Sequence, residues 1–308
     1  MPVKTPVALV VFNRPDVTRR VIEAVRQAKP ATLLVVADGP RRSDEVTRCN
    51  EVRAIVLDSV DWECDVRTNF ADANLGCRRR VSSGLDWVFD EVPEAIVLED
   101  DCVPVPSFFT YCDALLARYR DDERVMHIGG YNAVPDRQTR ASYRFSRFSH
   151  VWGWATWRRA WQHYDVTMRG WPEFAQARVL RSMGASRTEE AYYRVMLDRV
   201  HANEIDTWDY QWQFACWSQS GLAVVPAVNL VTNVGFGDDG THTLSTSSLG
   251  RVPTQELPTL VHPDLIVPDG LKDRQTFRQV ISGGNLRQRA YNRAWLALWA
   301  VMPHRWRR

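Results

Sequence analysis

Continuous apolar runs that alternate with stretches of helical spacing constrain the fold of this 308-residue chain more than any other feature. The runs at 7–12, 33–37 and 95–98 are typical of strands buried on both faces of a sheet. Between the first two runs, apolar residues recur at helical spacing over 17–27, with Asp16 as the expected N-cap. This alternation predicts an α/β fold with a mostly parallel sheet and helices on both faces, in which ligands bind at the carboxyl ends of the strands.

The remaining elements follow the same pattern in the first half and become less regular after about residue 125. In the first half we expect helices at 44–58, from the turn at 74–76 to about 90, and at 108–119, with a short strand at 65–68. In the second half we expect strands at 125–128 and 222–232, helical stretches at 185–200 and 206–218, and a loop at 235–248.

No repeat or linker marks a hard domain boundary. We expect one large domain in which a nucleotide-sugar-binding half, 1–125, grades into an acceptor-binding half, 126–250. A C-terminal extension, 251–308, follows.

The composition excludes several classes of function. A formal net charge of only +2 provides no basic field of the kind that binds nucleic acid. The thirteen tryptophans suit stacking on sugars or bases. The six cysteines lack the spacing of a zinc site, and no apolar run reaches the roughly 20 residues of a membrane span. We therefore expect a cytoplasmic protein with reduced thiols.

Three adjacent acids, Glu99, Asp100 and Asp101, follow the buried run at 95–98. Three carboxylates in this place cannot all be buried without partners, and a divalent cation would neutralise them. Oxygen ligands suit Mg²⁺ or Mn²⁺, which bridge diphosphate oxygens and stabilise a leaving diphosphate. The alternative is a solvated acidic turn.

Polar residues also end the first two strands, at Asn13, Arg14 and Asp38. Because right-handed β-α-β connections bring such ends to one edge of the sheet, we expect them to meet the three acids in one crevice. The turn at Asn74 and Gly76 leads into a helix whose first turns carry three arginines, Arg78, Arg79 and Arg80. They could hold a diphosphate or a base at the helix N-terminus, or form a solvated basic face.

These motifs together resemble a nucleotide-sugar-dependent glycosyltransferase of the GT-A fold. The spacing of Asn74, Gly76 and Gly84 is similar to that of the large inverting family-two group, and 98–101 resembles the variant DXD motif of the N-acetylglucosaminyltransferase I group. In the second half, 151–154 resembles the Gly-Trp turn of that group, and the Trp-Asp pair at 208–209 resembles its catalytic pair.

The resemblance implies a role for each matching residue. Asp101 would bind the metal ion directly, and Asp209 would be the catalytic base, with Asp206 as an alternative because Tyr210 stands where the animal enzymes carry a second acid. His242, after a Gly-rich segment, would bind metal or phosphate. The donor would be bound by Asn13, Arg14, Asp38, Asn74, Gly76, Arg78, Arg79, Glu99, Asp100, Gly153, Trp154 and Trp208.

The function expected from the resemblance is inverting, metal-dependent transfer of a hexosyl or N-acetylhexosaminyl group. The donor would be a nucleotide-diphosphate sugar, with a UDP-sugar expected, and the acceptor a hydroxyl of a glycan or a lipid-linked glycan. The alternatives are a sugar nucleotidyltransferase, a non-catalytic carbohydrate-binding protein and a metal-dependent phosphohydrolase. The loop at 13–15 has no glycine, which disfavours a nucleotidyltransferase.

The C-terminal segment 286–308 combines tryptophans with six arginines around an apolar stretch. Such a segment suits a helix lying in an anionic membrane surface, which would place the protein peripherally on the inner face of the membrane. The alternative is a terminal helix that docks on the core.

Overall fold

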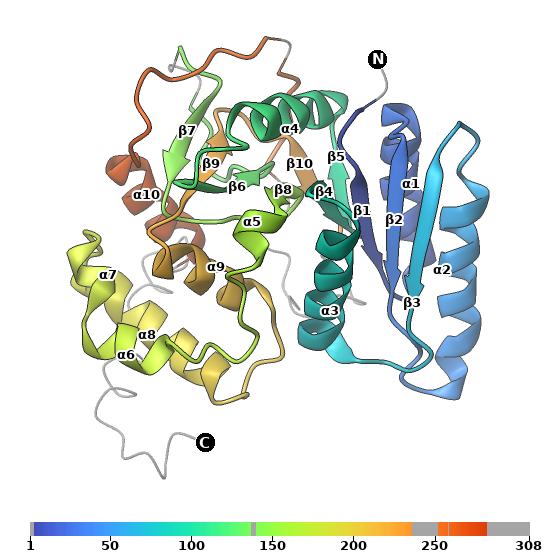
Figure 1. Cartoon of the computed structure of the whole chain (residues 1–308), viewed down its shortest axis with the longest axis horizontal. Helices are drawn as coiled ribbons and strands as arrows, with labels where there is room; N and C mark the ends of the chain where they lie inside the picture. The colour runs from blue at the N-terminus through green and yellow to red at the C-terminus, as the bar shows by residue number, and fades with distance from the viewer. Residues whose placement is uncertain (1–2, 137–139, 236–251, 258, 282–308) are drawn as a thin grey trace.

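An eight-stranded sheet runs through both halves of the chain in the computed structural model, which describes residues 3–136, 140–235, 252–257 and 259–281 (Figure 1). The strand order is β3-β2-β1-β4-β8-β6-β9-β7. The strands are β1 Val7–Val11, β2 Thr32–Ala37, β3 Asp65–Phe70, β4 Glu94–Glu99, β6 Val125–Gly129, β7 Tyr143–Ser146, β8 Trp154–Trp157 and β9 Leu222–Pro226. A separate two-stranded sheet pairs β5 Cys102–Pro104 with β10 Val231–Asn233.

The main sheet is mixed but mostly parallel, as predicted. Strands β3, β2, β1 and β4 are parallel neighbours, and β6 and β9 form a further parallel pair. Strand β8 lies antiparallel between β4 and β6, and β7 is antiparallel to β9 at the far edge. The antiparallel β8 therefore joins the two halves into one continuous α/β sheet.

Helices cover both faces of the sheet. The longer ones are α1 Pro15–Ala28, α2 Val46–Asp58, α3 Gly76–Glu91, α4 Pro106–Arg118, α8 Arg187–His201 and α9 Asp209–Ser218. The shorter ones are η1 Ser43–Glu45, α5 Arg158–Trp161, α6 Trp171–Gln176, α7 Val179–Ser182, α10 Gly270–Thr276 and η3 Phe277–Ile281.

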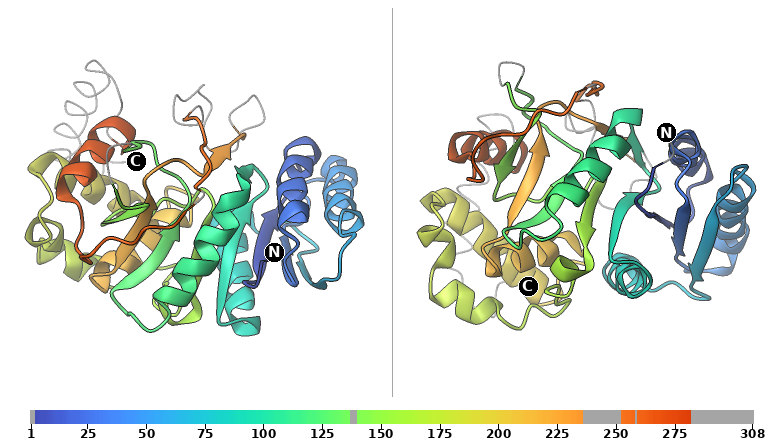
Figure 2. Two further views of the ribbon diagram at one scale, coloured as in Figure 1. Left: turned by 90° about the horizontal axis from the view of Figure 1, so that it is seen from above. Right: turned by 45° about the horizontal axis from the view of Figure 1, so that its top comes forward.

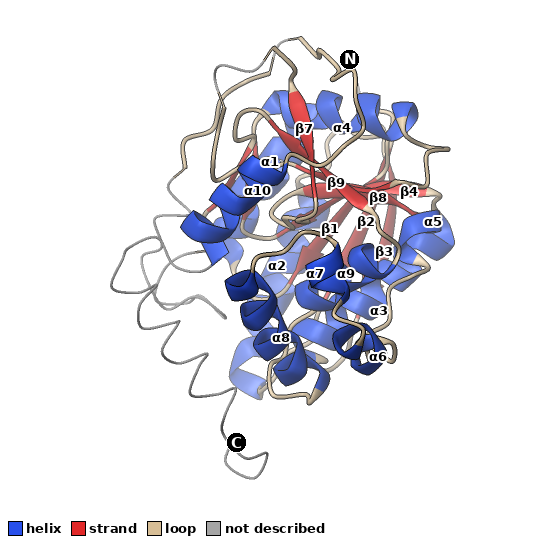
Figure 3. Ribbon diagram, turned by 90° about the vertical axis from the view of Figure 1, so that its left-hand side faces the viewer, coloured by secondary structure: helices blue, strands red, loops and turns tan. Residues whose placement is uncertain are grey.

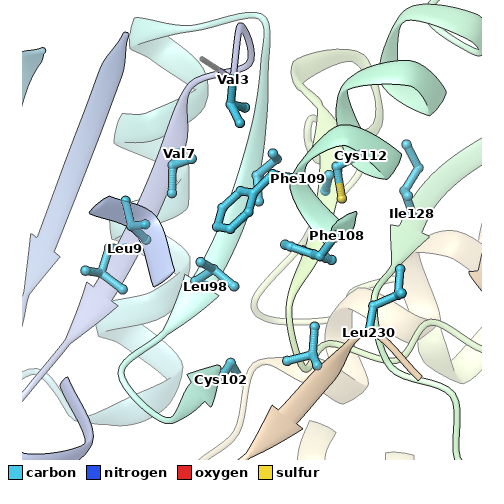
Figure 4. Packing of buried hydrophobic residues seen from close by; sticks show 14 of the residues in the cluster. Val3, Val7, Leu9, Leu98, Cys102, Phe108, Phe109, Cys112, Ile128 and Leu230 are labelled. Carbon is cyan, nitrogen blue, oxygen red and sulfur yellow. The ribbon is translucent and has the colours of Figure 1, made fainter. Parts of the chain in front are cut away.

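The alternation of side chains along β1 and β2 decides which helix packs on which face. Val7, Leu9 and Leu33 face one core cluster with α1, α2 and α4, whereas Ala8 and Leu34 face another with α3, α5 and α9 (Figure 2). Figure 4 shows the first cluster, where Phe108 and Phe109 of α4 lie near Leu98 of β4. Strands buried on both faces explain the continuous apolar runs of the sequence.

Two local expectations are corrected by the structure. Helix α1 begins at Pro15, with Arg14 rather than Asp16 at the N-cap, because the fixed φ of proline suits the first helical position. The expected strand at 222–232 is two strands, β9 and β10, in different sheets. The chain leaves the main sheet after Pro226, and β10 then crosses to pair with β5, so that Asn233 lies opposite Cys102.

A third core cluster lies beside the main sheet, among α6, α7, α8 and α9 with Phe277 (Figure 3). Helix α10 is held there by Asp273, a fully buried carboxylate that accepts hydrogen bonds from Ser146 Oγ at 2.6 Å and Arg147 N at 3.0 Å. In the described part of the chain, no helix is both long and apolar enough to cross a bilayer. The basic segment 286–308 lies outside the described residues.

Candidate active site

A cleft with a volume of about 470 Å³ opens where β1, β2 and β4 end. Its opposite wall comes from 151–152, the segment 206–209 at the start of α9, and 233–235 after β10. The sequence-predicted residues that line it are Arg14, Asp38, Asn74, Gly76, Glu99, Asp100, Asp101, Trp208 and Asp209. The topology therefore brings both halves of the chain to one crevice.

The guanidinium of Arg14 lies against two of the three acids. Its Nη2 donates to Asp101 Oδ2 at 2.9 Å and forms a short hydrogen bond to Asp100 Oδ1. Burial by itself would lower the pKa of Arg14, but the charges of Asp100 and Asp101 outweigh it and raise that pKa. Burial raises the pKa of Asp100, opposed by the charge of Arg14. Arg14 thus supplies part of the positive charge that the acids need.

Glu99 lies in the same cleft without such a cation. Burial, followed by the charges of Asp101, Asp100 and Asp209, raises the pKa of Glu99 well above its usual value, and Arg14 only partly offsets this. The protonated form of Glu99 is therefore more favoured here than it is for an exposed glutamate.

Two residues that the sequence analysis missed complete the surroundings of Asp101. Asn233 Nδ2 donates to Asp101 Oδ1 at 3.2 Å, and Gly235 lies so close that a side chain there would overlap Asp101 Oδ2. The backbone N–H of Val234 donates to the Asp101 carbonyl at 2.8 Å. The Asn-Val-Gly sequence at 233–235 is a turn signal, but it does not indicate which strand end the turn approaches.

Asp38 connects the end of β2 to the turn before α3. Its Oδ1 accepts from Gly39 N at 2.8 Å and Leu75 N at 2.9 Å, and its Oδ2 accepts from Asn74 Nδ2 at 2.8 Å. Burial raises the pKa of Asp38, and the backbone N–H groups oppose that shift. The carboxylate therefore fixes the shape of this end of the cleft.

Arg80 and Arg41 line the same end of the cleft. Arg80 is one of the three arginines expected near a diphosphate or a base, whereas the sequence pattern does not predict Arg41. Arg80 is buried and bonds Asn69 Oδ1 at 2.8 Å through Nη2, while its buried Nε–H has no hydrogen-bond partner among the described residues. The guanidinium of Arg41 lies 5.1 Å from the ring centroid of Phe12. Nε and Nη2 of Arg41 donate to the carboxylate of Glu45.

Several predicted donor residues do not line the cleft. Asn13 Nδ2 instead donates to Glu45 Oε1 at 3.2 Å. Arg78 turns to Asn203 and Ile205 in the other half of the chain, and Arg79 is exposed. The free N–H groups expected at the start of α3 are bonded, because the carboxylate of Asp206 accepts from Cys77 N and Arg78 N.

The Gly-Trp turn also differs from its expected position. Trp154 begins β8 and is fully buried, because β8 is an interior strand of the sheet. Its ring stacks 5.6 Å from that of Trp208, which does line the cleft. Gly153 has a φ of +61° and packs on Val231. The residues of this turn that line the cleft are Val151 and Trp152.

Asp209 lies at the first position of α9 and lines the cleft. Its Oδ1 accepts a short hydrogen bond from Thr207 Oγ1 and a bond of 2.9 Å from Tyr210 N. Because both donors address the same oxygen, the carboxylate is oriented by its own segment. Thr207 lines the cleft as well, and the sequence pattern does not predict it.

In the described residues, no three His, Cys, Asp or Glu side chains are grouped so that they could hold a metal ion by themselves. Magnesium at nucleotide sites usually takes only one or two protein carboxylates, with phosphate oxygens and waters as its other ligands. Asp101 fits that role, because it lines the cleft and its side chain keeps 16% exposure beside Arg14. His242 lies outside the described residues.

A comparison with protein-family models and with curated proteins found no match. Among solved structures, a crystal structure of UDP-glucose pyrophosphorylase complexed with UDP-glucose is similar, with a TM-score of 0.32 and 7% sequence identity. The match covers 51% of this chain and 78% of that one.

Proposed function

We propose that this protein is a metal-dependent, inverting glycosyltransferase that moves a sugar from a UDP-sugar to a hydroxyl of a glycan or lipid-linked acceptor. One observation carries the proposal: Asp209 and the three acids line one cleft from different elements, the start of α9 and the end of β4. The charge of Asp209 contributes to the raised pKa of Glu99, which is consistent with this common location.

Asp209 is the proposed base. It accepts the proton of the acceptor hydroxyl as that oxygen bonds to the anomeric carbon, while the bond from that carbon to the diphosphate breaks. One base opposite one leaving group gives a single displacement and an inverted anomeric carbon. The hydrogen bond from Thr207 to Asp209 Oδ1 leaves Oδ2 for the acceptor proton.

The acids and Arg14 would serve the donor. A divalent cation held by Asp101 would supply positive charge to the departing diphosphate. Arg14 and Asn233 hold the Asp101 carboxylate in place by hydrogen bonds to its two oxygens. Glu99 would form a hydrogen bond with a hydroxyl of the donor.

The end of the cleft near Asp38 would take the nucleoside. The carboxylate of Asp38 and the guanidinium groups of Arg80 and Arg41 line it. Phe12, beneath Arg41, adds an aromatic face. These groups are suited to a base and ribose.

The full chain with Mn²⁺ and a panel of UDP-sugars tests the proposal. A transferase releases UDP and passes the sugar to an acceptor, with slow hydrolysis when none is added. Pyrophosphate release from UTP and a sugar 1-phosphate would instead identify a nucleotidyltransferase, and phosphate release a phosphohydrolase. Binding without turnover would indicate a carbohydrate-binding protein. A donor at 100 times its Kd should stabilise the fold by roughly 2.7 kcal/mol.

A lipid-linked acceptor would require contact with a membrane, for which we propose the segment 286–308. The proposal rests on its tryptophans and arginines. Flotation with anionic liposomes, using the full chain and a chain ending at residue 285, tests it. Equal flotation of both chains would contradict this role.

A further inference from the structure

The carboxylate of Asp206 caps a helix that lies 129 residues earlier in the chain. Its Oδ2 accepts from Cys77 N and its Oδ1 from Arg78 N, both at 3.2 Å, at the first turn of α3. The N-cap residue of this helix, Leu75, provides no side-chain cap. A carboxylate at a helix N-terminus satisfies unpaired N–H groups and is favoured by the helix dipole.

Gly76 permits this contact for two reasons. Its φ is +79°, a conformation that L side chains rarely adopt. A Cβ at this position would also lie only 2.9 Å from Asp206 Oδ2. The glycine that resembles part of a donor motif therefore also makes room for a carboxylate from the other half of the chain.

Arg78 holds the same segment from the side. Its guanidinium forms short hydrogen bonds to Asn203 Oδ1 and to the carbonyl oxygen of Ile205. Asn203 has a φ of +61°, which marks a sharp turn between α8 and this segment. Together with Asp206, these contacts form a clamp between the start of α3 and residues 203–206.

The clamp lies immediately before the proposed base. Asp209 follows Asp206 by three residues, so their Cα atoms are at most about 11 Å apart. Asp206, Thr207 and Asp209 all line the cleft, as does Gly76. The start of α3 follows the turn that Asp38 binds. This contact therefore joins the segment that leads to Asp209 to the nucleotide end of the cleft, in addition to the core packing of Trp208 and Trp212.

We infer that Asp206 is a positioning residue, which holds Asp209 in register with the donor by capping α3. This inference rests on the proposed function, in which Asp209 is the base. In this role Asp206 is not the base itself. Its contact with the start of α3 connects the two halves of the chain. The same role explains why three residues, Asp206, Asn203 and Ile205, accept hydrogen bonds from Cys77 and Arg78 at the start of α3.

The test compares Asp206→Asn with Glu204→Gln, a matched loss of charge two residues away in a surface pair with Arg199. The two oxygens of Asp206 accept one hydrogen bond each, from Cys77 N and Arg78 N. The side chain of asparagine has only one oxygen, so it cannot replace both bonds. We expect Asp206→Asn to lower kcat about 10-fold and to change KM for the donor less than about 2-fold. The fall in rate at low pH, which is the acid limb of the pH profile, should remain because Asp209 is still the base. Glu204→Gln should leave both constants unchanged.

Amide hydrogen exchange measures the clamp without any assay of activity. Exchange at Cys77 and Arg78 should rise in Asp206→Asn and stay at the wild-type level in Glu204→Gln. An unchanged kcat, or unchanged exchange at these amides, would overturn the inference. A fall in kcat of about 10²–10⁴-fold, with the acid limb absent from the remaining activity, would overturn it too, by making Asp206 the base. If the wild type turns over no nucleotide sugar, the proposed function fails, and the exchange result alone decides the clamp.

Discussion

Arg14 binds Asp101 directly, with its Nη2 2.9 Å from Oδ2, and the same nitrogen contacts Asp100. The two side chains come from the ends of neighbouring parallel strands, β1 and β4. The proposed metal ligand thus has a protein cation beside it in this structure. This arrangement partly neutralises the negative charge of the three acids.

Replacing Arg14 should destabilise the protein. Arg14→Met leaves the buried carboxylate of Asp100 without its main partner. Loss of one partner of a buried pair costs about 3–5 kcal/mol, and we expect roughly 2–4 kcal/mol here because Arg14 keeps 21% exposure. Urea unfolding measures this loss of unfolding free energy. Arg19→Met, which removes the exposed pair with Glu51, is the control and should cost less than about 1 kcal/mol.

Glu99→Gln should stabilise the protein at neutral pH. Because the pKa of Glu99 is higher in the folded chain than its usual value of 4.5, the folded state binds this proton more tightly. This tighter binding stabilises the folded state fully at pH values below the pKa of Glu99 in the unfolded chain. The stabilisation is lost as pH rises through the pKa of Glu99 in the folded chain. The variant should therefore match the wild type near pH 4 and exceed it increasingly at higher pH. Thermal unfolding across pH measures the difference, and a constant difference would refute the expectation.

Removing the proposed base should abolish most turnover. Asp209→Asn keeps the size of the side chain but cannot accept the acceptor proton, so kcat should fall about 10²–10⁴-fold. Steady-state kinetics with an unchanged circular dichroism spectrum checks this. Turnover near the wild-type rate in a folded variant would exclude Asp209 as the base.

Metal dependence should follow Asp101. Chelation of divalent cations should stop transfer by the wild type, and Mn²⁺ should restore it. In Asp101→Asn, the increase in unfolding temperature that Mn²⁺ and UDP produce together should disappear. Asp113→Asn is the control, because the carboxylate of Asp113 accepts from the backbone N–H groups of Lys4 and Thr5 and does not line the cleft. This variant should retain the increase in unfolding temperature. The same increase in both variants would show that the metal site lies elsewhere.

Gly84 should be intolerant of a side chain. A Cβ there would overlap Cγ1 of Val36, because α3 packs closely on β2. Gly84→Ala should cost about 1–3 kcal/mol, as overpacking in a core does. At Gly170 the nearest atom, Phe214 Cζ, would lie 3.7 Å from a Cβ, so Gly170→Ala is the matched control. Equal urea midpoints for the two variants would show that the packing is looser than described.

Local patterns are sufficient to predict the sheet and one edge of the cleft. The apolar runs that form β1, β2 and β4 are buried on both faces, so their hydrophobicity alone identifies them as interior strands. Because parallel strands end at one edge, the strand pattern alone places Arg14, Asp38 and the acid triplet together.

Contacts between distant segments are decided only by the tertiary structure. Nothing near Asn233 in the sequence indicates that β10 pairs with β5 and brings its amide to Asp101, and nothing near Asp206 indicates that it caps α3. The family resemblance implies that Trp154 binds the donor, but β8 inserts between β4 and β6 and buries this side chain. The sequence by itself determined the apolar strands β1, β2 and β4 and the chemistry at their ends, because hydrophobic periodicity is local. The tertiary structure decided which polar groups face each other, because pairing across 100 or more residues depends on the packing of the whole chain.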